Sequence, residues 1–245
     1  MSEIEKLKIK IFADGADLNE ITELNKKNFI KGFTTNPSLM RKAGIDDYKK
    51  FAIDVLKIVK EKPISFEVFS DEISEMEQQA REIASWGKNI YVKIPITNSK
   101  GEKTINLIKN LSSNAIKCNV TAVLTMEQVK EVYEVLDVNV PSVISIFAGR
   151  IADTGLDPSS TIRESLNLCK SKEKVEILWA STREVLNIIQ ANHVGCHIIT
   201  VPHPILHKLS GIGKNLTQVS LDTVQGFLKD SIKANYKIDI KKNEI

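Results

Sequence analysis

The sequence predicts an α/β protein that folds as a single (β/α)8 (TIM) barrel, with an extra helix in the second unit and an amphipathic helix near the C-terminus. Three observations predict this class. The 245 residues match the length of about 250 that one such barrel needs. Short runs rich in Ile and Val alternate with helical patterns, as in a parallel sheet covered by helices. No Pro-rich or Gly/Ser-rich linker divides the chain, so we expect one domain over 1–245, with the barrel at about 8–210.

Eight candidate strands follow one another along the chain. Seven of these runs end in residues able to do chemistry, which lie 22 to 36 positions apart. One strand, one helix and two connections occupy roughly this length. Because the carboxyl ends of parallel strands surround one mouth of a barrel, we expect the end residues to converge there. The candidate strands are Lys8–Ala13, Gly32–Thr35, Ile64–Phe69, Ile90–Ile96, Ile116–Val123, Ser142–Phe147, Val175–Trp179 and His197–Pro202.

Helical patterns lie between these strands. In the second unit, Pro37–Ala43 predicts a short helix and Asp46–Lys60 a further one. Asp71 and Thr125 each precede apolar residues at helical spacing, so we expect both to be N-caps. After the last strand, apolar residues at helical spacing predict an amphipathic helix at about 219–236, which can fold back on its own barrel or pack on a neighbouring subunit. These residues are Leu221, Val224, Leu228 and Ile232.

Composition excludes several classes of function. A net charge of +3 is too small to indicate a nucleic-acid partner. The segment Met1–Lys6 lacks the basic and apolar regions of a signal peptide, and no apolar stretch approaches the roughly 18 residues that span a bilayer. Cys118, Cys169 and Cys196 are odd in number and widely spaced, which is typical of buried thiols in a reducing compartment. We therefore expect a cytoplasmic protein with neither a nucleic-acid nor a membrane partner.

Lys93 is the first candidate catalytic residue. It lies in the apolar run Ile90–Ile96. A buried ammonium loses hydration, which favours the free amine that attacks a ketone or aldehyde carbonyl. An edge-strand lysine with a packed stem and its head in water would give the same local pattern.

Two carboxylates follow other strands. An imine-forming lysine needs a proton shuttle and a base for carbon–carbon cleavage, and Glu67 and Asp14 are available for these tasks. Each can instead be a surface acid or a helix cap. Asp17 is a suitable cap for the first helix, which leaves Asp14 free for other work.

Arginine is scarce, with five residues against 29 lysines, and Arg150 and Arg183 follow the sixth and seventh candidate strands. Because the planar guanidinium suits phosphate oxygens, this placement indicates a phosphorylated substrate. Ser181 could add a hydroxyl to the same phosphate. Either arginine could also be a surface residue at the start of a helix.

From Phe12 to about Leu209, the chain resembles the class I transaldolases and the shorter transaldolase-like sugar phosphate aldolases. Its most distinctive feature is the Thr-Asn-Pro segment at 35–37, which is followed in order by a lysine strand and an Asn-x-Thr strand. The matching segments are Ala13–Asp17, Thr34–Ser38, Val92–Pro95, Asn119–Thr121 and Gly149–Ile151.

The resemblance implies a role for each candidate residue. Lys93 would form a Schiff base, Asp14 would take the hydroxyl proton during cleavage, and Glu67 would shuttle protons through a water held by Thr121. The substrate would be held by Asn36 and Asn119 on the hydroxyls of the dihydroxyacetone unit, by Ser145 on its terminal hydroxyl, and by Arg150, Ser181 and Arg183 on phosphate. Neither a metal nor another cofactor is implied, and a homo-oligomer is expected.

Two positions help to choose a branch of this family. The fructose 6-phosphate aldolase branch typically has Gln where this chain has Glu67, and Tyr where it has Phe147. The resemblance implies that in that branch the Tyr hydroxyl protonates the enamine and releases dihydroxyacetone, which a phenyl ring cannot do. The resemblance therefore implies a transaldolase of the pentose phosphate pathway, acting on sedoheptulose 7-phosphate or fructose 6-phosphate. The alternatives are a lyase that releases dihydroxyacetone and a catalytically silent barrel that binds a phosphosugar.

The sequence also departs from the family at several points. The chain is shorter than the dimeric transaldolases, Ser145–Phe147 lacks a proline that many relatives have after the serine, and Trp179–Thr182 replaces a more usual Gly-Ala-Ser-Phe. These changes affect the phosphate side, so they concern substrate identity more than the chemistry at Lys93.

Two further patterns are not expected to form sites. The histidines lie in two pairs at a spacing of four, 193/197 and 203/207, but no third and fourth ligands follow at a closed spacing, so we expect no metal. His203, just past the eighth strand, could line the mouth, but we expect it to pack or to be exposed. The segment Gly211–Asn215 lacks the spacing of a P-loop and is expected to be a turn.

Overall fold

The computed structural model describes residues 3–238, so positions 1–2 of the N-terminal segment lie outside the described residues. The chain forms two compact units, Met1–Leu209 and Ser210–Ile245. The expectation of a single domain over 1–245 stays a prediction.

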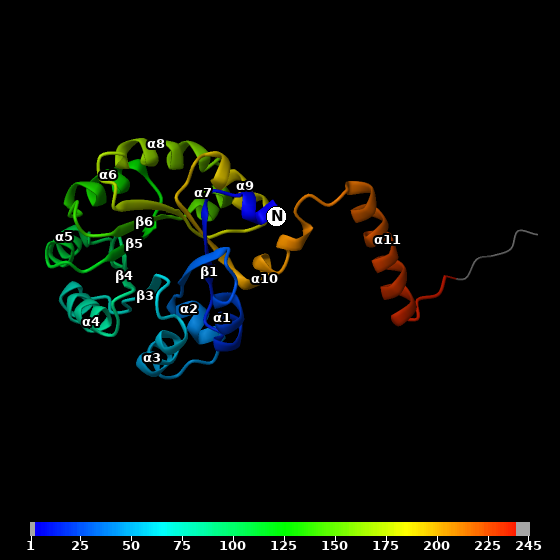
Figure 1. Cartoon of the computed structure of the whole chain (residues 1–245), viewed down its shortest axis with the longest axis horizontal. Helices are drawn as coiled ribbons and strands as arrows, with labels where there is room; N and C mark the ends of the chain where they lie inside the picture. Colours follow the sequence, from blue (N-terminus) through cyan, green and yellow to red (C-terminus); the bar gives the residue numbers. More distant parts are fainter. Residues whose placement is uncertain (1–2, 239–245) are drawn as a thin grey trace, which may run out of the picture. The chain divides into compact units, whose positions relative to one another are not determined.

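The first unit is a closed barrel of eight parallel strands in chain order, with β8 paired to β1 (Figure 1). It is a (β/α)8 TIM barrel, which confirms the predicted fold class, and every predicted strand is present with ends that differ by a few residues at most. The strands are β1 (Lys10–Asp14), β2 (Ile30–Thr34), β3 (Ile64–Glu67), β4 (Ile90–Pro95), β5 (Cys118–Val123), β6 (Ser142–Ile146), β7 (Val175–Trp179) and β8 (Ile198–Pro202).

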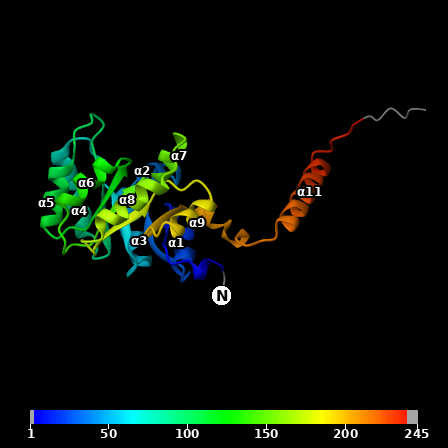
Figure 2. The ribbon, with the colours of Figure 1, turned by 90° about the horizontal axis from the view of Figure 1, so that it is seen from above.

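Helices surround this barrel, and two of them, α2 and α3, lie between β2 and β3, which confirms the extra helix in the second unit (Figure 1). The short helices α2 and α7 lie at the end of the barrel opposite to the blue segment that precedes β1 (Figure 2). The helices are η1 (Glu3–Lys6), α1 (Leu18–Asn25), α2 (Pro37–Lys42), α3 (Tyr48–Ile58), α4 (Ile73–Ser85), α5 (Ile105–Ser113), α6 (Met126–Val135), α7 (Ala148–Asp153), α8 (Ser159–Cys169), α9 (Leu186–His193), α10 (His203–Leu206) and η2 (Leu209–Gly211).

Two of the predicted helix caps are confirmed and one is wrong. Asp17 accepts from the backbone of α1, and Thr125 forms a capping box with Gln128 in α6. Asp71 does not cap α4, whose N-cap is Glu72 and has no side-chain cap bond. The Asp71 carboxylate is engaged elsewhere, because it bonds to the loop that follows β4.

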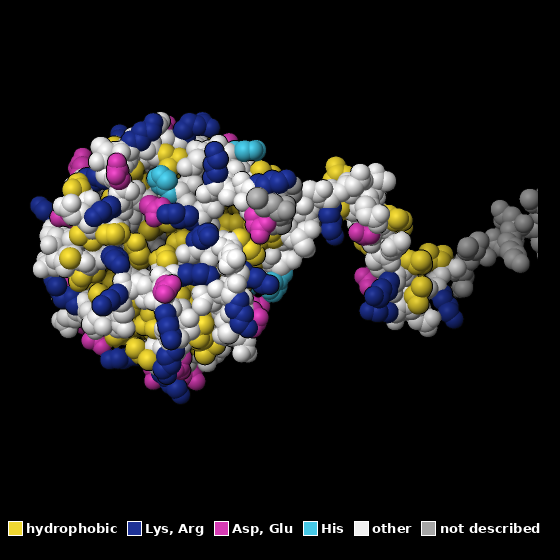
Figure 3. Space-filling model, in the orientation of Figure 1, with side chains coloured by type: hydrophobic (Ala, Val, Ile, Leu, Met, Phe, Trp, Pro, Cys, Tyr) yellow, Lys and Arg dark blue, Asp and Glu magenta, His cyan; other side chains and the backbone are white. Residues whose placement is uncertain are grey.

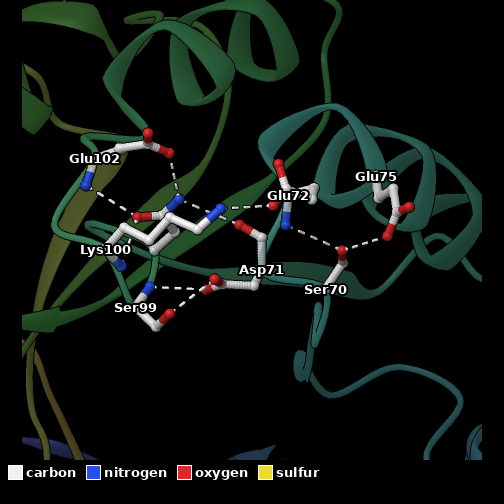
Figure 4. Close-up of polar contacts among 8 residues, drawn as sticks. Ser70, Asp71, Glu72, Glu75, Ser99, Lys100 and Glu102 are labelled. Carbon is white, nitrogen blue, oxygen red and sulfur yellow. Dashed lines mark hydrogen bonds and ion pairs between the residues drawn. The ribbon is translucent and has the colours of Figure 1, made fainter.

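This contact ties together the loops that follow β3 and β4 (Figure 4). The backbone N and the Oγ of Ser99 each donate to the Asp71 carboxylate at 2.7 Å, and Lys100 pairs with Glu72 at 2.8 Å. The Lys100 pair is exposed and contributes little by itself, whereas the bonds of Asp71 fix one loop to the backbone of the other. The two strands that carry Glu67 and Lys93 are therefore linked just above their ends.

Every second residue of a strand points into the interior of the barrel. Phe12, Val143, Leu178 and Ile198 form part of a buried apolar cluster at the level below the strand ends. A Cβ atom on Gly32 would lie 2.5 Å from the Phe12 ring, so the absence of a side chain there makes room for the ring. This apolar level closes the barrel beneath the polar residues at the mouth.

The second unit contains α11 (Leu216–Lys233), which begins and ends somewhat earlier than the predicted 219–236. Asn215 accepts from the backbone N of Thr217 and of Gln218, an N-cap that the prediction missed. The sequence leaves open whether α11 folds back or packs on a neighbour, and both alternatives stay predictions. Among residues 3–238, no helix has the length and apolar character needed to cross a membrane.

Candidate active site

The mouth at the C-terminal ends of the strands holds a cavity of about 540 Å³. Ten of the eleven predicted site residues line it, and Thr121 does not. The ten come from strand ends or the segments that follow them, and they are Asp14, Asn36, Glu67, Lys93, Asn119, Ser145, Phe147, Arg150, Ser181 and Arg183.

Lys93 lies at the centre of this group and is 7% exposed. Its Nζ lies 3.1 Å from Glu67 Oε2 and 3.4 Å from the carbonyl O of Thr35. The pairing of Glu67 with Lys93 and of Lys93 with Asn119 in the strand ladders places the three side chains next to one another. The predicted burial is therefore confirmed, but the surroundings of the amine are not wholly apolar, because the Glu67 carboxylate lies beside it.

Asp14 is a half-buried carboxyl that lines the same cavity. Burial raises its pKa, and Lys93, a hydrogen bond from Thr34 and His203 act in the opposite direction. Thr34 Oγ1 donates to Asp14 Oδ1 at 2.6 Å and lies 2.5 Å from Thr200 Oγ1. Because burial is the largest effect, Asp14 holds a proton more readily than an ordinary aspartate does, which suits a group that takes up a proton and returns it.

The carboxamides at the mouth have fixed orientations. Asn119 Nδ2 donates to Ser65 Oγ at 2.9 Å, and Ser145 Oγ donates to Asn119 Oδ1 at 2.6 Å. Asn36 is the N-cap of α2, where its Oδ1 accepts from the backbone N of Leu39. The amide NH2 group of Asn36 therefore remains available to donate to a substrate in the cavity.

The side of the cavity formed by β6 and β7 carries two arginines. Arg183 forms an ion pair with the Asp153 carboxylate, which the sequence did not predict. A Cβ atom on Gly149 would lie 1.8 Å from the carbonyl O of Ser181, so α7, which carries Arg150, packs tightly against the end of β7. Ser181 has a left-handed φ of 63°, a strained conformation for this residue of the kind found at functional sites.

Phe147 and Thr121 complete the set. Phe147 is half-buried, lines the cavity and packs on the apolar cluster inside the barrel. The Oγ1 of Thr121 is buried and has no hydrogen-bond partner within the described part of the chain. The next residue, Ala122, has a left-handed φ of 59°, so the backbone of β5 is strained directly beside Thr121.

Sequence reasoning missed ten of the residues that line the cavity, and five of these have polar side chains, which are Thr34, Ser38, Lys42, Thr182 and Thr200. Thr34 and Thr200 continue the inward-facing period of β2 and β8, so the alternation of these strands could have identified them. Ser38 and Lys42 come from α2 and gave no such signal, because one lysine among 29 is not informative.

The other candidate ligands do not gather into a metal site. Within residues 3–238, no group of three or more His, Cys, Asp or Glu side chains has a geometry that could hold a metal ion. His203 is packed, as expected, and is 5% exposed. Burial raises the pKa of the Cys118 and Cys196 thiols to about 12, which keeps both protonated and unreactive.

Known proteins are similar to this chain over nearly its whole length. The model of the transaldolase/fructose-6-phosphate aldolase family matches residues 11–244. A "Probable transaldolase" of Thermoanaerobacter sp. (strain X514) is 35% identical over 94% of this chain and 100% of its own length. Another, from Clostridium kluyveri (strain ATCC 8527), is 35% identical over 91% of this chain and 97% of its own length.

Among solved structures, KGPDC from Streptococcus mutans is similar with a TM-score of 0.54. The identity is 8%, over 79% of this chain and 88% of that one, so this likeness concerns the fold alone. The family model and the curated relatives cover nearly all of the sequence, including every strand end at the mouth. The chain therefore belongs to the transaldolase/fructose-6-phosphate aldolase family.

Proposed function

We propose that this protein is a transaldolase that transfers a dihydroxyacetone unit from a ketose phosphate to an aldose phosphate through a Schiff base on Lys93. The donor would be sedoheptulose 7-phosphate or fructose 6-phosphate, in the pentose phosphate pathway. The observation that carries the proposal is the buried Lys93 amine, 3.1 Å from Glu67 and in one cavity with Asp14. Membership of the family supports an aldolase-type reaction.

In the first step, the Lys93 amine attacks the C2 carbonyl of the donor and forms a carbinolamine. Glu67 is placed to take the ammonium proton beforehand, because the two groups already form an ion pair. Protonation and loss of the carbinolamine hydroxyl as water then gives the iminium ion. The Thr121 hydroxyl, which has no hydrogen-bond partner among residues 3–238, is suited to hold a water for this shuttle.

In the second step, Asp14 takes the proton of the C4 hydroxyl and the bond between C3 and C4 breaks. The electron pair of that bond enters the iminium system, so the three-carbon unit stays on Lys93 as an enamine while the aldose leaves. The aldehyde of an acceptor aldose is then attacked by C3, Asp14 returns its proton, and water releases the new ketose. Retention of the enamine at the site favours transfer.

A second candidate function is a lyase that releases free dihydroxyacetone. The distinction rests on Glu67 and Phe147, which both line the cavity. Because Phe147 offers no hydroxyl to protonate the enamine, we favour transfer over release. The catalytically silent barrel is disfavoured, since a sugar-binding protein has no need of a buried amine beside two carboxylates.

The remaining features of the proposal concern substrate and assembly. Arg150, Ser181 and Arg183 would contact phosphate, with Arg183 exchanging its Asp153 partner for phosphate oxygens or sharing its guanidinium between them. Asn36, Asn119 and Ser145 would hold the dihydroxyacetone hydroxyls. We further propose a cytoplasmic homo-oligomer.

The test is the release of glyceraldehyde 3-phosphate from fructose 6-phosphate over many turnovers, with and without erythrose 4-phosphate as acceptor. A transaldolase requires the acceptor for continued release. Release that is independent of the acceptor would identify the lyase. No release with fructose 6-phosphate or with other ketose phosphates would favour the silent barrel, and the Lys93→Met variant serves as the inactive control.

A further inference from the structure

Ser65 is a polar side chain inside the apolar level of the barrel. It lies on β3 two residues before Glu67, pairs with Tyr91 in the ladder between β3 and β4, and is 3% exposed. Together with Phe12, Tyr91 and Val143 it lines a cavity of about 270 Å³ at the N-terminal end of the barrel. A hydroxyl among such groups costs free energy unless it forms a hydrogen bond, and alanine would avoid this cost. The reason for a serine therefore lies in the bond that it makes.

Ser65 is the first member of a chain of three buried side chains that reaches the mouth. Asn119 Nδ2 donates to Ser65 Oγ at 2.9 Å, and Ser145 Oγ donates to Asn119 Oδ1 at 2.6 Å. Asn119 and Ser145 line the cavity that contains Lys93, and Ser65 lies one level beneath them. The Ser65 hydroxyl can therefore act on a substrate through the Asn119 carboxamide.

The chain holds both ends of this carboxamide. The terminal torsion of asparagine is broad, so one bond at the oxygen leaves the plane of the amide free to turn, and a second bond at the nitrogen fixes it. Because Ser145 gives its proton to Asn119, its oxygen remains as an acceptor, while Asn119 keeps a second amide hydrogen as a donor. An acceptor beside a donor matches a hydroxyl group, which can use both, and does not match a methyl group.

We infer that Ser65 is a positioning residue that fixes Asn119 and Ser145 for the terminal hydroxyl of the donor, and so makes the protein selective for ketoses that carry this group. The inference rests on the proposed function, in which Asn119 and Ser145 hold the dihydroxyacetone hydroxyls. Because Ser65 acts through Asn119, its loss should change which donor is preferred, while Lys93 should still form a Schiff base.

The experiment compares kcat/KM for fructose 6-phosphate with kcat/KM for 1-deoxyfructose 6-phosphate, which has a methyl group in place of the terminal hydroxyl. The full-length protein is used, with erythrose 4-phosphate as acceptor. The matched variants are Ser65→Thr, which keeps the hydroxyl, and Ser65→Val, which has nearly the same shape without it. The added methyl group of either variant can extend into the lower cavity that Ser65 lines.

We expect the wild type to prefer fructose 6-phosphate to the deoxy donor. In Ser65→Val this preference should fall by about three- to tenfold, which is the range that one hydrogen bond is typically worth. In Ser65→Thr the preference should be retained, because the acceptor for Asn119 Nδ2 is still present. A general loss of structure would instead lower kcat/KM for both donors by the same factor.

Two controls accompany these variants. Ser142→Ala removes a buried hydroxyl of β6 that bonds to the carbonyl O of Val140 at 3.3 Å, outside the chain from Ser65 to Ser145, and it should leave the preference unchanged. Thermal melting establishes that each variant folds, and if Ser65→Val does not, Ser65→Ala removes the hydroxyl without added volume and carries the test.

Three results would overturn the inference. They are a wild type without preference, a preference that stays the same when the hydroxyl at 65 is removed, and an equal loss of preference in Ser65→Thr and Ser65→Val. The last of these would show that size, and not the hydroxyl, matters at this position.

The failure of the proposed function would look different. Borohydride reduction in the presence of fructose 6-phosphate should attach the three-carbon unit to Lys93 in wild type and in Ser65→Val. Attachment to Lys93 with an unchanged preference would overturn only the role of Ser65. No attachment in the wild type would overturn the proposed function and the inference together.

Discussion

The two ends of the barrel are built from the same eight strands but differ in chemistry. The C-terminal mouth has a cavity of about 540 Å³ that contains Lys93, Asp14 and Glu67. The N-terminal end has a cavity of about 270 Å³ whose walls include Phe12 and Tyr91. On this face, Lys and Arg side chains lie among patches of hydrophobic atoms (Figure 3).

A step of two residues along one strand accounts for the difference. In β1 the step leads from Phe12 to Asp14, and in β4 it leads from Tyr91 to Lys93, so the same inward face changes from apolar to polar. The lower level supplies packing and the upper level supplies reactive groups. Substitutions at the mouth should therefore cost activity with little loss of fold, and substitutions below should cost stability with little change in chemistry.

The largest expected effect is at the mouth. Lys93→Met should lower turnover by at least about 10⁴-fold, because no other group can form the covalent intermediate. The fold should persist, since the Glu67 side chain is 18% exposed and can remain hydrated without its partner. The matched control is Lys10→Met at the opposite end, where Lys10 forms an exposed pair with Glu176 at 2.8 Å. Steady-state kinetics that showed turnover in Lys93→Met would end the Schiff-base proposal.

The second effect is at the opposite end. Phe12→Ala should destabilise the barrel by about 3 to 5 kcal/mol, because it removes a buried ring and leaves a cavity beside Gly32. Urea unfolding measures this loss, and borohydride trapping under folding conditions tests the chemistry. If the Phe12→Ala protein remained folded but lost trapping, the apolar level would also contribute to the chemistry at the mouth, which would contradict the division between packing and reactivity.

A smaller effect should sharpen the assignment within the mouth. Phe147→Tyr should shift the products toward free dihydroxyacetone by about tenfold, equivalent to about 1.4 kcal/mol, because it supplies a hydroxyl beside the enamine. Chromatography of the products at fixed acceptor concentration measures the ratio, and Phe12→Tyr below the mouth is a control that should not alter it. An unchanged ratio in Phe147→Tyr would remove Phe147 as the residue that favours transfer.

The smallest effect concerns stability at the mouth itself. Because burial raises the pKa of Asp14 in the folded protein, the native state binds this proton more tightly than the unfolded chain does. Stability should therefore fall as pH rises from the unfolded pKa through the folded pKa, and the loss should persist above that range. Asp14→Asn should be more stable than wild type at pH 7, by the order of about 1 kcal/mol typical of such substitutions, with the gain shrinking toward acidic pH.

Denaturant unfolding at several pH values tests this prediction. If Asp14→Asn were less stable than wild type at pH 7, then Lys93, Thr34 and His203 would together outweigh the cost of burying the carboxylate. The Asp14→Asn variant should lose activity whatever its stability. The effect of this substitution on catalysis can therefore be measured separately from its effect on the free energy of unfolding.

The sequence predicted the parts of the site that follow from strand periodicity. Asp14, Glu67, Lys93 and Asn119 lie at inward positions at strand ends, and a parallel barrel brings such positions together whatever the details of packing. The fold was predictable for the same reason, since alternating strand and helix patterns leave few topologies open.

The parts that could not be predicted depend on contacts between distant segments. Asp71 can satisfy either the first turn of its own helix or another loop, and only the folded chain places Ser99 within reach. The pairs of Arg183 with Asp153 and of His203 with Glu20 likewise join residues that share no local pattern.

The most direct test of the difference between the two ends of the barrel uses mass spectrometry of peptides. It identifies the lysine to which borohydride reduction attaches the three-carbon unit of fructose 6-phosphate. The proposal predicts one modified peptide, which contains Lys93, in wild type and in Lys10→Met, and none in Lys93→Met. Modification at a lysine of the N-terminal end, or a modified peptide that persists in Lys93→Met, would contradict the assignment of the chemistry to the mouth.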